Sequence, residues 1–368
     1  MLLRTCSVLL LAACSSLPTA DPAGAPPTAP PTRAELAALP MFDGESRARV
    51  AFADLERAVD GADIVVLAEL HGHPLGLPLH QALFAEALAR HPGAALCLEF
   101  LPRDTQHLVD AYLTNLLTLD ELDAALAHIR GASAEDHAPL LRAAKASGIP
   151  VIAANAPRLY TTLVREQGFA ALEELTPHQH TLFDAPAGLP TGPYRVRFFD
   201  TMAPMFAPGG VHGEEREGAP SALEAGAGTE TSEAAGEDTG VHDVATATPP
   251  IESEEAAATE PPVEPPIEDR LAPETRDQIL GMLRAQSLWD ATMAGSVAMQ
   301  LEASRSPVFL VVGSFHTNHD GGTLQELRAR APGARIVTIA FEDTDASELR
   351  EEDRGAADFV VYVGSFPH

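Results

Sequence analysis

The sequence predicts an α/β fold in which a mostly parallel sheet carries helices on both faces. Short runs of apolar, often β-branched residues alternate with longer amphipathic stretches along the chain, and this alternation is typical of parallel strands joined by helices. The strand-like runs are apolar on both faces, as expected for strands covered by helices on each side. The chain has 368 residues, of which 45% are hydrophobic, so it can bury a sizeable core.

The elements follow in order along the chain. Apolar runs predict strands at residues 63–68, 94–98, 149–154, 308–312 and 334–340, and an edge strand at 359–363. Helical spacing predicts helices at residues 75–90, 104–115, 119–127, 136–147, 157–166, 170–175, 273–303 and 324–330. Gly148 is placed to stop the helix that precedes the third strand.

The first residues predict export and anchoring. Arg4 and the apolar stretch 8–13 have the pattern of a secretory signal. The residues that end at Cys14 resemble the bacterial lipobox, so residues 1–14 are predicted to be a lipoprotein signal with Cys14 as the lipidated residue. An ordinary signal peptide with an incidental cysteine is the alternative. Several acyl chains on Cys14 would hold the protein stably on a membrane, and Ser15 after it favours the outer membrane of a bacterial cell envelope by resemblance to lipoprotein sorting rules.

Two segments of biased composition surround the predicted domain. Residues 15–40 are rich in proline and are predicted to form an extended tether. Residues 210–270 are predicted to be a disordered acidic insertion, because residues 213–270 contain 16 acidic, two basic and six large apolar residues. Burying those six would stabilise the segment by about 18 kcal/mol at most, whereas ordering its backbone would cost about 58 kcal/mol. Residues 41–209 and 271–368 are left to form one α/β domain.

Charge and cysteine content exclude several classes of protein. The formal net charge is −29, and no cluster of Lys and Arg interrupts it, so binding to a nucleic acid is not expected. No apolar run reaches the roughly 18 residues of a transmembrane helix. The three cysteines are too few for a disulfide framework, and none forms a Cys-x-x-Cys pair.

Ionisable side chains stand where four predicted strands end. Glu69 and His71 follow the first strand and share one face of an extended chain, Glu99 ends the second, Arg158 follows the third and His316 follows the fourth. The carboxyl ends of parallel strands lie at one edge of the sheet, where ligands bind in such folds. Buried carboxylates there need a cation or an imidazole beside them. The two histidines are expected to supply neutral imidazoles, as metal ligands or as a general base.

Each of these side chains also has a structural explanation. A single His or Glu at a strand end is more often a helix cap, a loop ion pair or a solvated residue. Glu99 can pair with Arg103 four residues later. The joint occurrence of several such residues favours a site, although no single one does.

Five segments together carry a resemblance to a known family. Residues 66–73, 98–103, 148–158, 285–294 and 312–316 resemble, in order, the ChaN family of haem-binding uptake lipoproteins in the Tiki superfamily. The resemblance spans residues 62–324 without the insertion, and it implies an α/β fold, haem binding and a role in iron or haem uptake. The chain departs from the family pattern at Ala68, where glycine is common, and after His316, where a Gly-Ile-Pro sequence is missing. Carried over to this chain, the superfamily site consists of Glu69, His71, Glu99, Arg158, Asp290 and His316.

A haem carrier needs an axial iron ligand, apolar walls and cations for the propionates. Tyr194, Met202 and Met205 are the candidate cofactor-binding residues, and Arg195 and Arg197 are the candidate cations. We expect three partners: haem or another small ligand, a membrane that the protein reaches through its lipid, and a second copy of the chain in a homodimer.

The wider superfamily implies an alternative, because it includes metal-dependent proteases and erythromycin esterase-like enzymes. In a hydrolase, a divalent Mn, Co or Zn ion would be held by His71, Glu99 and His316. Glu69 or Glu99 would act as base and Arg158 would stabilise developing negative charge. A third interpretation, a tethered scaffold that recruits partners through the acidic insertion, leaves the strand-end residues without a role.

Overall fold

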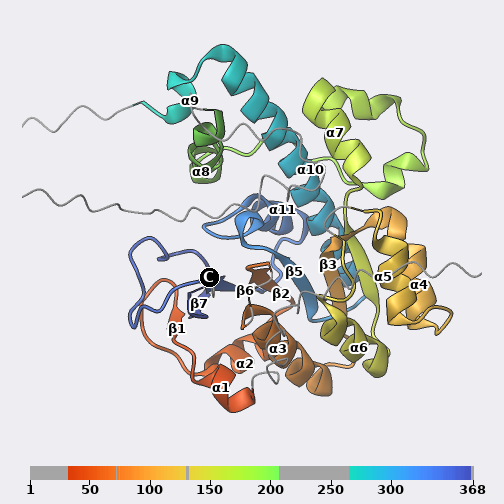
Figure 1. Cartoon of the computed structure of the whole chain (residues 1–368), viewed down its shortest axis with the longest axis vertical. Helices are drawn as coiled ribbons and strands as arrows, with labels where there is room; N and C mark the ends of the chain where they lie inside the picture. The colour runs from red at the N-terminus through yellow and green to blue at the C-terminus, as the bar shows by residue number, and fades with distance from the viewer. Residues whose placement is uncertain (1–31, 72, 74, 130–131, 207–264, 366–368) are drawn as a thin grey trace, which may run out of the picture.

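The computed structural model describes residues 32–71, 73, 75–129, 132–206 and 265–365 (Figure 1). The predicted lipoprotein signal with Cys14, most of the tether and residues 210–264 of the predicted insertion lie outside these residues. No helix in the described ranges combines the length and the apolar character needed to cross a bilayer.

The predicted α/β fold is confirmed. Seven strands form one sheet in the order β1-β7-β6-β2-β5-β3-β4, and every neighbouring pair is parallel except β1 with β7. The strands are β1 (Met41–Asp43), β2 (Ile64–Glu69), β3 (Ala95–Pro102), β4 (Val151–Asn155), β5 (Val308–Gly313), β6 (Ile336–Glu342) and β7 (Phe359–Tyr362). The middle strand, β2, lies beside β5, with Glu69 opposite Gly313.

The prediction that the last strand forms an edge of the sheet is wrong. β7 lies inside the sheet, because β1 pairs with it antiparallel and places Met41 opposite Val361. β1 is only three residues long, too short for apolar alternation to reveal it in the sequence.

Helices cover both faces of the sheet. They are α1 (Arg33–Ala37), α2 (Phe52–Gly61), α3 (Gly76–Arg90), α4 (Gln106–Leu113), α5 (Leu119–Leu126), α6 (Ala138–Ser147), α7 (Arg158–Gln167), α8 (Pro193–Met202), α9 (Ile267–Arg270), α10 (Pro273–Glu302) and α11 (Gly322–Arg330). Short 3-10 turns are η1 (Arg103–Thr105), η2 (Phe169–Glu174), η3 (Gln179–Leu182), η4 (Ala203–Phe206) and η5 (Ser314–His316). The helix predicted at 170–175 is therefore a 3-10 turn.

Side chains of β2 alternate between two apolar layers. Val65 and Leu67 belong to the larger cluster together with Leu83 of α3, whereas Val66 belongs to a second cluster together with Met293 of α10. Figure 1 shows α2 and α3 on one side of the strands and α10 and α11 on the other. Each fully buried aliphatic side chain of this kind stabilises the fold by about 1.5–3 kcal/mol, so the sheet is fixed from both faces.

The borders of the tether and of the insertion differ from the predicted ones. At the end of the tether, Thr32 and Glu35 form a capping box that starts α1, and Leu36 is buried. At the end of the insertion, α9 forms, and its Glu268 pairs with Arg195 of α8. Both helices are too short for periodicity to detect, and tertiary contacts decide them.

Candidate functional site

Glu69, the last residue of β2, is a buried carboxylate held between two histidines. Nδ1 of His71 lies 2.5 Å from its Oε1, and Nε2 of His137 lies 3.0 Å from its Oε2. Burial alone would raise the pKa of Glu69, but the two imidazoles outweigh burial and hold that pKa well below its usual range. Glu69 is therefore an ionised carboxylate, and it orients both rings.

The sequence analysis missed His137. It stands directly before α6 and far from any strand end, so the rule that identified Glu69 and His71 passes over it. Its ring is buried and stacks on Phe100, with centroids 4.2 Å apart and an interplanar angle of 16°. Its sequence neighbours, Glu135 and Asp136 before it and Ala138 after it, give no signal for a buried site residue.

Glu99 lies on the adjacent part of the sheet and faces β5. The backbone N–H of Gly313 donates to its Oε2 over 2.5 Å, and Nε2 of His316 lies 3.3 Å from its Oε1. A Cβ atom at position 313 would lie 3.2 Å from Nε2 of His71 and 3.4 Å from Oε2 of Glu99. Glycine at the end of β5 thus leaves room for both side chains, which lie next to it.

His316 connects Glu99 with Asp290 of α10. Its Nδ1 donates to Oδ1 of Asp290 over 2.7 Å. The hydroxyls of Thr323 and Tyr194 donate to Oδ1 and Oδ2 of Asp290, over 2.7 and 3.1 Å. Asp290, whose neighbours in the sequence gave no reason for a core carboxylate, is thus the point where α8, α10, α11 and η5 meet.

Five side chains therefore form a continuous row, which we call the acid–base row, with carboxylates and imidazoles in alternation. Its members are Glu69, His71, Glu99, His316 and Asp290. The two ends of the row are buried, since Glu69 is 6% and Asp290 1% exposed, whereas the side chain of His71, the second member, is 39% exposed. Five of the six site residues expected from the family resemblance are thus adjacent in space.

His316 is an imidazolium ion in this arrangement. Burial lowers the pKa of a histidine, but the carboxylates of Glu99 and Asp290 outweigh it and raise the pKa of His316 to about 10. The pKa of Glu99 is lowered, since the charges of His316 and His71 and the Gly313 N–H outweigh its burial. The sequence analysis expected His316 to be a neutral imidazole, whereas here it carries an extra proton. His316 has to lose that proton before it can bind a metal or act as a base.

Arg158, the sixth expected residue, is the first residue of α7 and is exposed. It lies at the carboxyl edge of the sheet, directly after β4.

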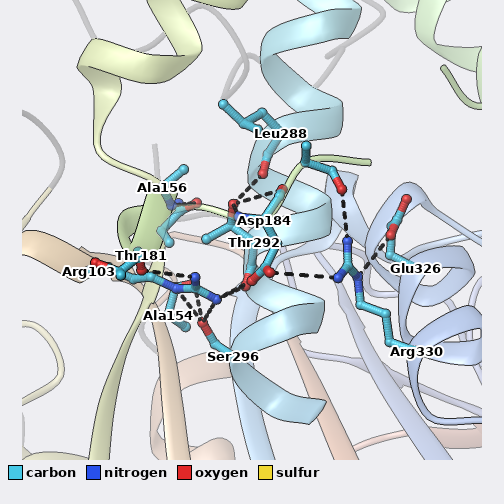
Figure 2. A network of polar contacts seen from close by, with 12 residues as sticks. Arg103, Ala154, Ala156, Thr181, Asp184, Leu288, Thr292, Ser296, Glu326 and Arg330 are labelled. Atoms are coloured by element: carbon cyan, nitrogen blue, oxygen red, sulfur yellow. Dashed lines mark hydrogen bonds and ion pairs between the residues drawn. The ribbon is translucent and has the colours of Figure 1, made fainter. Parts of the chain in front are cut away.

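Arg103 does not pair with Glu99. It donates instead to Asp184 over 2.5 Å and to Ser296 of α10 over 3.0 Å. Figure 2 shows Arg103 and Arg330 approaching Asp184 from opposite sides, with Thr292 and Ser296 of α10 between them. The predicted ion pair between Glu99 and Arg103 is therefore wrong. Arg103 instead contacts Thr181, Asp184 and Ser296, and so connects residues 181–184 with α10.

The candidate haem ligands lie on or beside α8. Tyr194 and Met202 are each 1% exposed, and Met205 is partly buried against the apolar cluster that contains Met202. Arg195 makes a two-pronged ion pair with Glu268, over 2.8 and 2.6 Å. Arg197 lies over the rings of Tyr194 and Phe315. The geometry brings Tyr194 into contact with the acid–base row but leaves the methionines in a separate apolar cluster.

The described residues do not form the metal site that the hydrolase interpretation expects. Across residues 32–206 and 265–365, apart from the few positions not described, no three His, Cys, Asp or Glu side chains are grouped so as to hold a metal ion. Of the three expected ligands, Glu99 pairs with His316, whose Nε2 lies 3.3 Å from its Oε1, and His71 contacts Glu69 through Nδ1.

Comparison with known proteins identifies related sequences and folds. A sequence model of the family described as "Haem-binding uptake, Tiki superfamily, ChaN" matches residues 55–327. A solved structure entitled "Cofacial heme binding to ChaN of Campylobacter jejuni" is 15% identical, covers 88% of this chain and 96% of its own, and superposes with a TM-score of 0.55.

Two further structures are more distant. The type III effector HopBA1 is 11% identical and covers 90% of this chain and 98% of its own, with a TM-score of 0.40. A mutant of the erythromycin esterase EreC in its open conformation is 13% identical and covers 87% and 82%, with a TM-score of 0.38. No curated protein sequence matches the chain.

Proposed function

Because the chain belongs to the ChaN family of haem-binding uptake proteins in the Tiki superfamily, we propose that it binds haem. The observation that carries the proposal is the family match, which spans residues 55–327. The fold shared with the Campylobacter ChaN structure supports it. The haem would lie at the carboxyl edge of the sheet, on the side formed by α8.

The side chains around α8 fit the demands of haem. Haem would supply an iron that takes an axial protein ligand, and two propionates that need cations. Tyr194, Met202 and Met205 carry oxygen or sulfur atoms of the types that bind haem iron. Arg197 carries a buried Nη2 for which no hydrogen-bond partner is found among the described residues, so one cation beside Tyr194 has an unused donor. Partly buried apolar side chains provide the walls: Leu189, Met205, Phe206 and Phe315.

Access to these ligands requires a movement. Tyr194 and Met202 are buried in the structure described here, so iron could reach either only if α8 and η4 shifted outward. Met205 is half-buried on η4 and needs a smaller shift. Tyr194 would also give up its hydrogen bond to Asp290.

The proposal is tested by titrating the full chain with haemin and recording the Soret band. A saturable Soret shift is expected. Replacing the true axial ligand, in the set Tyr194→Phe, Met202→Leu and Met205→Leu, is expected to move the Soret maximum of the complex. Tyr160→Phe is the matched control, because Tyr160 is a buried tyrosine in a different apolar cluster. A wild-type chain that leaves the haemin spectrum unchanged would refute haem binding.

We extend the proposal to the cell envelope. Cys14 carries the lipid, residues 15–31 lead to the domain, and the protein takes part in haem or iron uptake at the outer membrane. Metabolic labelling with palmitate and membrane fractionation test this, with Cys14→Ala expected to remove both the label and the membrane association. Labelling that survives in Cys14→Ala would contradict it.

A homodimer is part of the same proposal. If the haems stack cofacially, as named for the Campylobacter protein, two copies that each present one haem are sufficient. Light scattering on the full chain with and without haemin measures the mass. A monomer at saturating haemin would exclude the dimer.

The acid–base row favours a second candidate, a hydrolase acting on an ester or a peptide. An ionised Glu99 and an imidazolium His316 lie side by side, and Asp290 holds the other nitrogen of His316. Glu99 would accept a proton from water, and His316 would donate one to the leaving group. No step of this candidate is derived through the Mn, Co or Zn ion considered above.

Hydrolysis of p-nitrophenyl esters and of a fluorogenic peptide library tests the second candidate. Turnover that is lost in Glu99→Gln and His316→Gln, but kept in the exposed control His178→Gln, would support it. Turnover that is the same in all four proteins would show that the row does not catalyse the reaction.

A further inference from the structure

Two arginines on α8 differ sharply in their partners. Arg195 directs Nε and Nη2 at the two carboxylate oxygens of Glu268, and its guanidinium lies 5.4 Å from the Phe199 ring centroid. Its donors toward a carboxylate are therefore already used. Arg197 faces a different side of the helix, where its guanidinium lies 5.4 Å from the ring centroid of Tyr194 and 5.9 Å from that of Phe315.

Arg197 is incompletely bonded. Its Nη1 donates to the backbone carbonyl of His319 over 3.4 Å, at the long limit for a hydrogen bond. Its Nη2 is buried, and among the described residues no acceptor reaches it. A buried donor of a charged group that has no acceptor is costly, so a partner that supplies oxygen atoms to Nη1 and Nη2 of this half-buried guanidinium would be favoured.

The loop that faces Arg197 is held in an unusual conformation. His319 and Asp320 both have left-handed φ angles, 52° and 58°, which residues other than glycine rarely adopt. Such strain persists only where surrounding contacts impose it, and it concentrates at functional sites. The His319 carbonyl that Arg197 contacts is therefore fixed in place, and Arg197 lies between this loop and the phenol of Tyr194.

We propose that Arg197 binds a carboxylate of the ligand, a haem propionate, and that Arg195 does not. The inference rests on the proposed haem binding and goes beyond it by assigning the anionic subsite. A guanidinium presents parallel N–H groups that match a carboxylate, and the aromatic rings around Arg197 exclude the water that would weaken the pair.

The full chain is titrated with haemin and with haemin dimethyl ester, whose propionates carry no charge. Wild-type protein is expected to bind haemin on the order of tenfold or more tightly than the ester, which is the loss expected for one charge-assisted pair. Arg197→Met is expected to bind both equally, whereas Arg195→Met, the matched control two residues away, keeps the wild-type preference. Arg197→Lys, which retains the charge, is expected to keep part of the preference and serves if Arg197→Met fails to fold.

The outcomes are distinct. A preference for haemin that survives in both Arg197 variants overturns the inference and leaves haem binding intact. A wild type that binds haemin and its ester equally also overturns it. No Soret change with wild type overturns the proposed function and, with it, the inference.

Discussion

His137 determines how Glu69 is held. Because Phe keeps the stacking on Phe100 but cannot donate a hydrogen bond, His137→Phe leaves the buried Glu69 carboxylate with one imidazole instead of two. The free energy of unfolding is expected to fall by about 2 kcal/mol, as for loss of a hydrogen bond to a buried charge. Urea unfolding measures it against His178→Phe, an exposed control expected to stay within about 0.5 kcal/mol of wild type. Equal effects of the two substitutions would mean that His137 does not support Glu69.

The pH dependence of stability reports on His316. Its pKa is raised to about 10 by Glu99 and Asp290, so the folded state keeps a proton that the unfolded state loses near pH 6.5. The stabilisation is therefore complete below about pH 6.5 and is lost as the pH rises toward 10. Unfolding free energies of wild type and His316→Gln, measured from pH 6 to pH 10.5, are expected to differ most at pH 6 and to converge at high pH. A difference that stays constant over this range would contradict the ion pair.

At the scale of elements, α10 and α11 pack against each other through a glycine. A Cβ at Gly322, the first residue of α11, would lie 2.1 Å from Oδ2 of Asp290 and 2.8 Å from Cε1 of Tyr194. Asp290 cannot swing away without breaking its bonds to His316 and Thr323. The close approach of the helices therefore depends on the missing side chain.

Gly322→Ala is expected to destabilise the protein by about 1–3 kcal/mol, the usual cost of overpacking. Gly61→Ala is the matched control, since its Cβ would meet only the side chain of Arg335, at an ordinary 3.7 Å, and alanine favours a helix. Thermal unfolding compares the two. A Gly322→Ala protein as stable as the control would show that α11 can move without cost.

The limits of sequence-based prediction also differ by element. Long buried strands and α10 were predicted within a few residues, because apolar runs and helical periodicity are properties of the segment itself. β1 and the 3-10 turn η2 were not predicted correctly, because pairing with β7 and packing around Phe183 and Leu288 decide them. The ten-residue helices α2 and α8 were not predicted either, so the sequence pattern also failed for elements of ordinary length.

At the scale of the whole molecule, ligand binding should raise stability. A ligand that binds only the folded state stabilises it by mass action, by about 2.7 kcal/mol at a concentration one hundred times its Kd. For a domain of this size, that corresponds to a rise in Tm of roughly 5 °C. Differential scanning fluorimetry of the full chain with haemin measures the shift, and Arg197→Met should show a smaller one at equal haemin. An unchanged Tm at saturating haemin would contradict binding to the folded state.

The sequence by itself determined the α/β class, the order of the six strands from β2 to β7, and the residues that end the strands, because each depends on neighbours along the chain. Only the tertiary structure decided which side chains meet. It showed that His137 contacts Glu69 and that Arg103 pairs with Asp184. It also showed that Arg195 is paired with Glu268, whereas Arg197 has an unused donor among the described residues. The physical reason is that a buried charge is stabilised by whichever partner packing brings within hydrogen-bond distance, and those partners come from segments far apart in the sequence.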